Sequence, residues 1–254
     1  MQIDQPGILQ VSKAMVDDHC VLTVRGVLDS NTYLSLRDTI IGAALSRPLA
    51  VIVDVNELSV PATSAWTVFS SARWHVSRWP DVPVALVCYR HRYRREALAD
   101  SKISRHVPVH PTVESAIAQV SRTGRHRYRL HARAELMRGQ PSIWRACELT
   151  AEWLRAWSKP ELIPAVRSVA AVLVENAVAH AGGAVAIRLE TDGSSVIVAV
   201  EDTSSAVAIR REASATRGRI GGLEVVAAVC DAWGNAPTTT GKTVWALISR
   251  TADV

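Results

Sequence analysis

The sequence lacks the features that mark metal-binding, secreted and membrane-spanning proteins. Its four cysteines lie far apart and form no paired metal-binding spacing. Each has apolar neighbours, which is typical of reduced, buried thiols, so we expect a cytoplasmic protein. The first residues have no basic flank and no apolar core, so we expect no signal peptide. No apolar run approaches the length of a membrane span, and no repeat or low-complexity tract is present.

The composition indicates a folded protein with a slightly basic surface. Its 254 residues are enough for two modest domains, and 48% are hydrophobic, so we expect a substantial core. The net charge is +5, and arginines gather in residues 90–95 and 122–129. These stretches could bind nucleic acid or an acidic protein. A solvated loop and a linker are the favoured interpretation, because neither stretch lies on a nucleic-acid-reading motif.

The first half of the chain predicts a small α/β domain. Strands and helices alternate in it, which favours one layered domain over residues 1–121, followed by a basic linker at 122–126. The expected strands are 21–28, 49–55 and 82–88, and the expected helices are 32–45, 65–76 and 113–120. The run from Leu49 to Val55 is continuously apolar, as in a buried central strand. Asn31 is the predicted N-cap of the first helix.

The second half, residues 127–254, predicts a second α/β domain. Expected strands are 127–132, 185–190, 195–201 and 242–249, and expected helices are 142–157, 168–181 and 221–230. Asp192-Gly193 predicts a hairpin between two of the strands. Ser142 is the predicted cap of the helix that begins there. Its expected packing face consists of Trp144, Cys147, Trp153, Leu154 and Trp157. Residues 202–219 are expected to form a polar loop.

The helix ending at Gly182-Gly183 is apolar yet carries three polar residues. Asn176 and His180 are four residues apart and share one helix face, whereas Glu175 is offset from Asn176 by about 100°. A buried Asn needs polar partners, because burial without them costs free energy. A bound ligand or a metal-linked phosphate would meet that need. A satisfied core Asn with a capping His is the alternative, and this helix alone favours the alternative.

Three further features, taken with Asn176, indicate a nucleotide site. Asp202 ends a strand, and a carboxylate there can accept a hydrogen bond from an adenine amino group. Gly221-Gly222 opens a helix, where backbone N–H groups can face phosphate. Residues 241–245 lead the last strand. An Asn side chain can help to hold Mg²⁺ that bridges the phosphates. Each feature alone could equally be an ordinary turn or linker.

Residues 127–250 resemble the GHKL-type (histidine-kinase-like) ATPase domain of bacterial anti-sigma-factor serine/threonine kinases. The stretches that carry the resemblance are 173–181, 200–202, 222–226, 231–234 and 241–246. The resemblance implies an α/β sandwich with helices on one face of a mixed sheet. It also implies ATP and Mg²⁺ as cofactors, with Asn176 as the Mg²⁺ ligand. The implied cofactor-binding residues are Asn176, Asp202, Gly218, Gly221, Gly222, Leu223 and Thr243.

The same comparison predicts that phosphoryl transfer is impaired. In that family a Glu four residues before the Asn is the general base, and Val172 stands at this position. A general base must share the helix face of the Asn to reach the same pocket. Glu175 is the only other candidate for the general base, and it is a poor one because it lies on a different face. The family motif Asp-x-Gly-x-Gly reads Asp-Thr-Ser-Ser-Ala at residues 202–206, without its glycines.

Residues 11–120 resemble the STAS domain of anti-sigma-factor antagonists. The resemblance rests on the strand 51–55 and on Ala62-Thr63-Ser64-Ala65, which opens a helix. In that family the loop reads Asp-Ser-Ser-Gly, and a partner kinase phosphorylates a Ser in it. Ser64 and Thr63 are therefore candidate phosphorylation sites. A plain helix N-cap is an equally favoured interpretation of the two hydroxyls.

Together these resemblances predict a fused regulator of transcription that works by partner switching. It would bind a sigma factor or an anti-sigma antagonist protein, with ATP shaping the docking surface. The two halves would dock within one chain or across a homodimer. The alternative is an active serine/threonine kinase that phosphorylates Ser64 or Thr63 in cis or in trans. We expect neither a membrane nor a nucleic acid as a partner.

Overall fold

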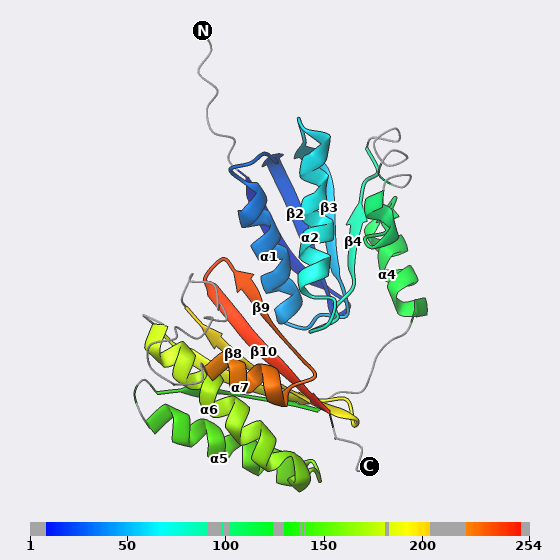
Figure 1. Cartoon of the computed structure of the whole chain (residues 1–254). Coiled ribbons are helices and arrows are strands. Elements are labelled where there is room, and N and C mark those ends of the chain that lie inside the picture. The colour runs from blue at the N-terminus through cyan, green and yellow to red at the C-terminus, as the bar shows by residue number, and fades with distance from the viewer. Residues whose placement is uncertain are drawn as a thin grey trace. The chain divides into compact units, whose positions relative to one another are not determined.

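The computed structural model describes residues 9–90, 98, 102–123, 130–137, 139, 141–180, 183–203 and 222–249. The chain divides into two compact units, Met1–His126 and Arg127–Val254, here called unit 1 and unit 2. Each unit has its own five-stranded sheet (Figure 1). The predicted linker residues 124–126, most of the first arginine-rich stretch and the polar loop from residue 204 lie outside the described residues.

Unit 1 is a sheet with helices on both faces. Its strand order is β1-β2-β3-β4-β5, and only the β1–β2 pair is antiparallel. The elements are β1 (Gln10–Val16), β2 (His19–Val27), α1 (Tyr33–Leu45), β3 (Val51–Ser59), the 3₁₀ helix η1 (Thr63–Trp66), α2 (Thr67–His75), β4 (Val84–Val87), the 3₁₀ helix η2 (Lys102–Arg105), β5 (Val109–His110) and α4 (Val113–Thr123).

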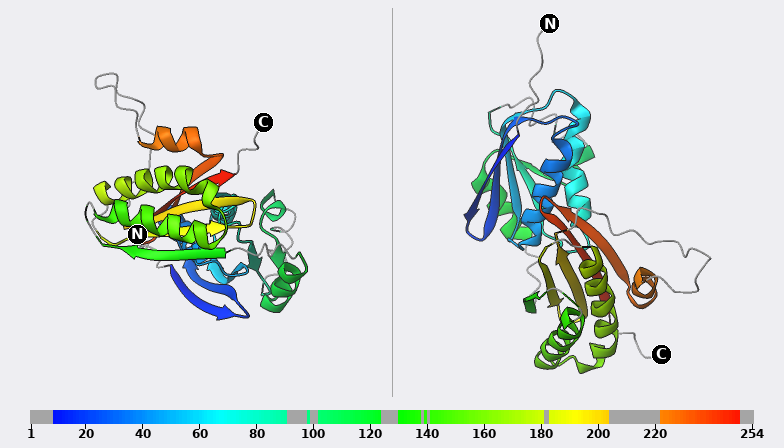
Figure 2. Two further views of the ribbon diagram at one scale, coloured as in Figure 1. Left: turned by 90° about the horizontal axis from the view of Figure 1, so that it is seen from below. Right: turned by 90° about the vertical axis from the view of Figure 1, so that its left-hand side faces the viewer.

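The centre of unit 1 is β3, as its apolar run predicts. Val51, Ile52 and Val53 are all fully buried, so both faces of the strand are covered. Figure 2 shows α1 and α2 side by side on one face of the sheet. On the other face, α4 packs against a cluster that includes Ile52 and Val87. The sheet and its helices therefore place the carboxyl end of β3, and the segment after it, at the rim of a packed core.

Strand β1 is absent from the sequence prediction. Its residues are almost all exposed, so the alternation that identifies a half-buried strand is missing. The two residues between β1 and β2, Asp17 and Asp18, have positive φ values of 46° and 61°. Two such residues form the tight turn that matches the twist of a hairpin, and Asp tolerates this conformation. The consecutive pair Asp17-Asp18 is the sequence pattern from which this hairpin could have been predicted.

Two boundaries in unit 1 also differ from the prediction. Asn31 is not the cap of α1; instead Asp29 Oδ1 accepts hydrogen bonds from the backbone N–H groups of Asn31 and Thr32, at 2.8 and 3.0 Å. These bonds, chiefly the one from Thr32, hold the pKa of Asp29 below its usual range. Helix α4 continues to Thr123, so residues 122 and 123 of the predicted linker are helical.

Unit 2 is a sheet with its helices on one face, as expected, but the sheet is not mixed. The order is β6-β7-β8-β10-β9, and every strand pair in the described residues is antiparallel. The elements are β6 (Leu130–Leu136), α5 (Pro141–Ala156), the 3₁₀ helix η3 (Pro160–Leu162), α6 (Ile163–His180), β7 (Val185–Thr191), β8 (Ser195–Asp202), α7 (Gly222–Val229), β9 (Ala232–Thr238) and β10 (Gly241–Ser249). Short turns join β7 to β8 and β9 to β10, and such turns produce antiparallel pairs.

Helix α6 forms the middle of the unit 2 core. Leu173 and Val174 on it are buried in one cluster with Val198 of β8 and Ala246 of β10. Residues 160–180 are long and apolar enough to cross a membrane by length and composition alone, with a mean hydropathy of 1.6. This corrects the expectation that no apolar run approaches that length. Packing against the sheet accounts for the apolar character of the helix.

The other predictions for unit 2 divide into confirmed and wrong ones. The hairpin at Asp192-Gly193 is confirmed: Asp192 Oδ1 accepts from the backbone N–H groups of Ser194 and Ser195, and Gly193 has a φ of 97°. Trp144 is wrongly placed on the packing face of α5, since 64% of it is exposed. Small and aliphatic residues between it and Leu154 make the contact instead. Strand β9 has no counterpart in the prediction.

Candidate functional site

The segment 60–67, here called the switch loop, leads from β3 into α2. Ala62 is extended (φ −104°, ψ 120°), and η1 begins at the next residue. Thr63 and Ser64 are exposed, whereas Ala65 and Trp66 are buried. The two buried side chains fix one side of this turn to the core. Two hydroxyl groups are thereby presented to solvent at the start of a helix.

The N-cap interpretation of these hydroxyls is wrong. The N-cap of η1 is Ala62, which makes no side-chain cap, and Thr63 and Ser64 are the first two residues inside the helix. The hydroxyl that stabilises the loop belongs to Thr67, whose Oγ1 donates to the Ser64 carbonyl oxygen at 2.7 Å. Tyr33 Oη of α1 lies 3.3 Å from the same Oγ1. Thr63 and Ser64 are therefore accessible residues on a loop that other groups hold in shape.

Asn56 fixes the carboxyl end of the sheet just before the switch loop. Its side chain is buried, and its Oδ1 accepts from the backbone N–H groups of Tyr89 and Arg90, at 2.7 and 2.9 Å. The amide nitrogen donates to Asp54 at 2.5 Å. Sequence reasoning missed Asn56, although a lone Asn in an apolar strand indicates a need for partners. It joins the end of β3 to the chain leaving β4.

An ion pair lies on the same part of the sheet. Arg25 of β2 binds Glu57 of β3 through two nitrogens, at 2.9 and 3.3 Å. The hydrogen bond from Arg25 lowers the pKa of Glu57. The pair is largely exposed, so its contribution to stability is small, but it links β2 to β3 at the edge from which the switch loop departs.

In unit 2, the structure separates the candidate residues on α6. Glu175 is exposed, Asn176 is half-buried, and Val172 is half-buried and packed against the core cluster. Glu175 therefore does not lie where a general base at position 172 would lie. His180, at the end of the helix, is also exposed. Asn176 reaches solvent, so its burial alone does not demand a ligand.

Asp202 is buried at the end of β8 and already has a charged partner. Its Oδ2 lies 3.6 Å from Nζ of Lys242, and the two side chains are 1% and 4% exposed. The residues are directly opposite each other in the β8–β10 register. Thr243 is the next residue along β10 and pairs with Glu201, so its side chain points to the other face of the sheet. The structure thus does not bring Thr243 together with Asp202.

Close backbone packing seals this strand end. A Cβ atom added to Gly241 would overlap the carbonyl oxygen of Asp202 and lie 2.7 Å from the Cα of Thr203. A Cβ atom added to Gly183 would lie 2.5 Å from Thr203 Oγ1. Glycine is needed at Gly241 because backbone atoms approach it so closely, whereas at Gly183 a rotation of the Thr203 side chain could make room. The end of β8 is held between the starts of β7 and β10.

The remaining candidate residues lie in or just before helix α7 in the sequence. Gly222 is its first residue and Leu223 its second, while Gly218 and Gly221 lie outside the described residues. Within the part of the chain that the structure describes, no three His, Cys, Asp or Glu side chains come together in a way that could hold a metal ion.

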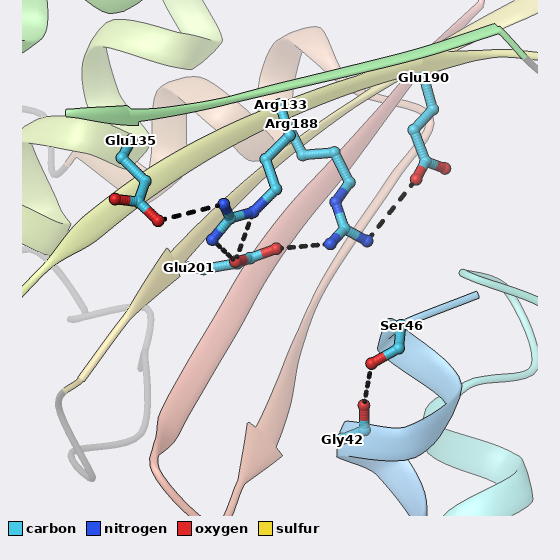
Figure 3. Close-up of polar contacts among 7 residues, drawn as sticks. All are labelled: Gly42, Ser46, Arg133, Glu135, Arg188, Glu190 and Glu201. Atoms are coloured by element: carbon cyan, nitrogen blue, oxygen red, sulfur yellow. Dashed lines mark hydrogen bonds and ion pairs between the residues drawn. The ribbon is translucent and has the colours of Figure 1, made fainter. Parts of the chain in front are cut away.

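A charged network lies on the sheet face opposite the unit 2 helices (Figure 3). Arg133 of β6 and Arg188 of β7 both bind Glu201 of β8, at 2.9 and 2.8 Å. Glu135 lies 3.5 Å from Arg133, and Glu190 lies 3.9 Å from Arg188. The alternation of charged residues along these strands is the sign that sequence reasoning missed. The network thus pairs charges of both signs within this face.

Comparisons with known proteins concern the first half of the chain. Residues 10–116 match the family model described as STAS domain. An anti-sigma factor antagonist from Mycobacterium paratuberculosis is similar in structure, with 17% identity, a TM-score of 0.38, and coverage of 45% of this chain and 95% of its own. No curated protein matches the chain.

Two structures of the anti-sigma factor antagonist SpoIIAA are also similar, each with 18% identity over 44% of this chain. The unphosphorylated form has a TM-score of 0.35 and is covered over 96% of its length. The phosphorylated form, described as the Bacillus cell fate determinant SpoIIAA, has a TM-score of 0.33 and is covered over 99% of its length. By the match of the family model, residues 10–116 of unit 1 form a STAS domain.

Proposed function

We propose that the chain is a partner-switching regulator of transcription whose STAS domain binds an anti-sigma factor or a related protein. The observation that carries the proposal is the switch loop of that domain. Buried Ala65 and Trp66 anchor it, while the Thr63 and Ser64 hydroxyls face solvent at the start of a helix. This is a surface that a protein partner and a kinase could both reach. The chain would act by binding and release in the cytoplasm.

Phosphorylation of Thr63 or Ser64 is the proposed switch. A phosphate would add a charge of about −1.5 to −2 and three strong acceptor oxygens. The start of a helix tolerates that charge because its N–H groups and dipole favour anions. A partner docked on the loop would have to bury the charge, so phosphorylation would lower its affinity. The proposed role of unit 2 is to bind a sigma factor or an antagonist, or to dock with unit 1 in the same chain or in a homodimer.

The test is binding of the full chain to each anti-sigma factor encoded in the same genome, measured by isothermal titration calorimetry. Wild type is compared with T63D, S64D and S46D. Ser46 is the matched control, an exposed serine that follows α1 in the same unit. We expect one of the two loop variants to weaken binding at least 10-fold and S46D to leave it unchanged. Equal affinities for all four proteins would contradict the proposal.

ATP with Mg²⁺ as a ligand of unit 2 is a separate proposal. It rests on the sequence resemblance of unit 2 to a GHKL-type ATPase domain, in which Asn176 is the implied Mg²⁺ ligand. The side chain of Asn176 is half-buried. Its test is titration of ATP·Mg²⁺ into wild type and N176A, with loss of affinity expected in the variant. Incubation of the full chain with radioactive ATP and Mg²⁺ tests the kinase alternative. Label on Thr63 or Ser64 without an added kinase would favour that alternative over a binding module.

A further inference from the structure

Strand β6 forms one edge of the unit 2 sheet. It is the first strand in the order β6-β7-β8-β10-β9, and among the described residues no strand pairs with its other side. Helix α5 packs on β6 and β7, so it lies above this edge. The N–H and C=O groups along an unpaired strand edge are a template for a further strand. The β6 edge is therefore a surface on which another chain could continue the sheet.

Exposed apolar side chains belong to the same edge. Among the described residues of unit 2, four large hydrophobic side chains are exposed, and Val229 is the one that lies elsewhere. The other three are Leu130 at the start of β6, Met137 just after its end, and Trp144 in the first turn of α5. Met137 is 86% exposed and Trp144 is 64% exposed. Single exposed hydrophobic residues are ordinary, but three at one edge indicate a contact surface, and Trp and Met are enriched in protein interfaces.

The sequence of β6 is complementary to itself in one antiparallel register. Arg133 and Glu135 point to the sheet face that carries the charged network (Figure 3), and Ala132, Ala134 and Leu136 alternate with them. In a pair of β6 strands centred on Ala134, Arg133 of each copy lies opposite Glu135 of the other. On the opposite face, Leu136 of each copy lies opposite Ala132 of the other. A pair centred on Arg133 or on Glu135 would instead place two like charges face to face, which is destabilising.

We infer that two copies of the chain associate through β6, so that two five-stranded sheets become one continuous sheet across a two-fold axis at Ala134. Such an interface uses the same patch on both copies, so the patch must complement itself. Glu135 is 77% exposed and lies 3.5 Å from Arg133 of its own chain, so its carboxylate is accessible to a second arginine. The exposed edge strand β1 of unit 1 carries Lys13 as its single charge, so it has no such complementarity.

This dimer gives a surface to the homodimer that the proposed function allows, but its test needs no anti-sigma factor. A dimer that binds no anti-sigma factor would refute the proposed function and leave the β6 interface standing. A monomer that binds one would do the reverse.

The first experiment is sedimentation velocity of the full chain over a range of concentrations, for wild type, E135R and K13E. E135R sets arginine against Arg133 on both sides of the two-fold axis, and the exposure of Glu135 lets the monomer fold as before. K13E is the matched control, a charge reversal on the exposed edge strand of unit 1. We expect a wild-type dimer whose Kd rises about 10-fold or more in E135R and is unchanged in K13E. A wild type that is monomeric at every concentration, or an E135R dimer as tight as wild type, would overturn the inference.

The second experiment tests the register by disulfide cross-linking of A134C and A132C in the full chain. At the two-fold axis, A134C places two thiols directly opposite each other, with Cβ atoms about 5 Å apart. The thiols of A132C would be four residues apart along the strands, about 13 Å, which is too far for a disulfide. Both alanines are half-buried on the same face of β6, so the variants are matched.

Mass spectrometry of the oxidised protein identifies the cross-linked peptides and separates them from disulfides of the native cysteines. We expect A134C to form the covalent dimer about 10-fold faster than A132C, or more. Equal rates, or no cross-link through either position, would overturn pairing about Ala134.

Discussion

Replacement of Gly241 by alanine should destabilise unit 2 more than replacement of any glycine in open space. The new methyl group would overlap the carbonyl oxygen of Asp202 and lie 2.7 and 2.9 Å from two further backbone atoms. Backbone atoms of a paired strand cannot rotate away as a flexible side chain can. Such overpacking typically costs 1–3 kcal/mol, so we expect about 3 kcal/mol, the upper end of that range.

Gly193 provides the control for backbone conformation. It has a φ of 97° in the β7–β8 turn, and a Cβ atom there would meet nothing within 4 Å. Its replacement by alanine carries only the cost of a left-handed conformation, about 1–2 kcal/mol. The difference between the two variants therefore isolates the close approach at the strand end.

Differential scanning calorimetry of the full chain measures both effects. A loss of about 3 kcal/mol corresponds to a fall in Tm of roughly 10 °C for a domain of this size, and the control should fall by about a third to two thirds as much. Unit 1 serves as an internal reference, since both substitutions lie in unit 2. If G241A melts at the same temperature as G193A, the backbone of Asp202 and Thr203 is not packed against Gly241, and the description of a sealed strand end is wrong.

Three other substitutions test separate parts of the structure. Phe69→Ala should cost about 3–5 kcal/mol in thermal melts because the ring is fully buried, whereas Trp74→Ala, at a side chain 73% exposed, should cost less than about 0.5 kcal/mol. Asn56→Ala should speed amide hydrogen exchange just after β4 at least 10-fold, because the N–H groups of Tyr89 and Arg90 lose their acceptor; unchanged exchange would remove its positioning role. Burial alone would raise the pKa of Asp192, but the hydrogen bonds of its turn outweigh it and hold that pKa well below the usual range. Asp192→Ala should therefore cost about 1 kcal/mol at pH 7, and the difference should shrink as the pH falls below about 4; a constant difference would contradict this.

The sequence predicts elements well where one physical preference dominates. The apolar run of β3 and the Asp192-Gly193 turn are local patterns, and both are present in the structure. Strand β1 is not predictable in this way because its exposed residues follow no alternation. The N-cap prediction of Asn31 is wrong because α1 begins one residue later, with Thr32 as its N-cap, and the neighbouring Asp29 carboxylate accepts the N–H groups of Asn31 and Thr32.

The candidate site in unit 2 depends on strand register, which a single sequence does not specify. Asp202 was correctly placed at a strand end, but its pairing with Lys242 follows from the alignment of β8 with β10. The same alignment puts Thr243 on the opposite face. The switch loop is a contrasting case, because the run from Ala62 to Ala65 is local and its exposed hydroxyls follow directly from the turn.

The Arg133–Glu201–Arg188 network also determines which strand alignment unit 2 can adopt. Arg133 and Arg188 stand directly opposite each other on β6 and β7, a repulsive pair that Glu201 of the next strand compensates. A shift of β6 by one residue would move Arg133 away from Glu201 and onto the face that packs against the helices, among buried aliphatic residues. The charges thus disfavour shifted registers of the edge strand β6, in addition to the apolar contacts of the core.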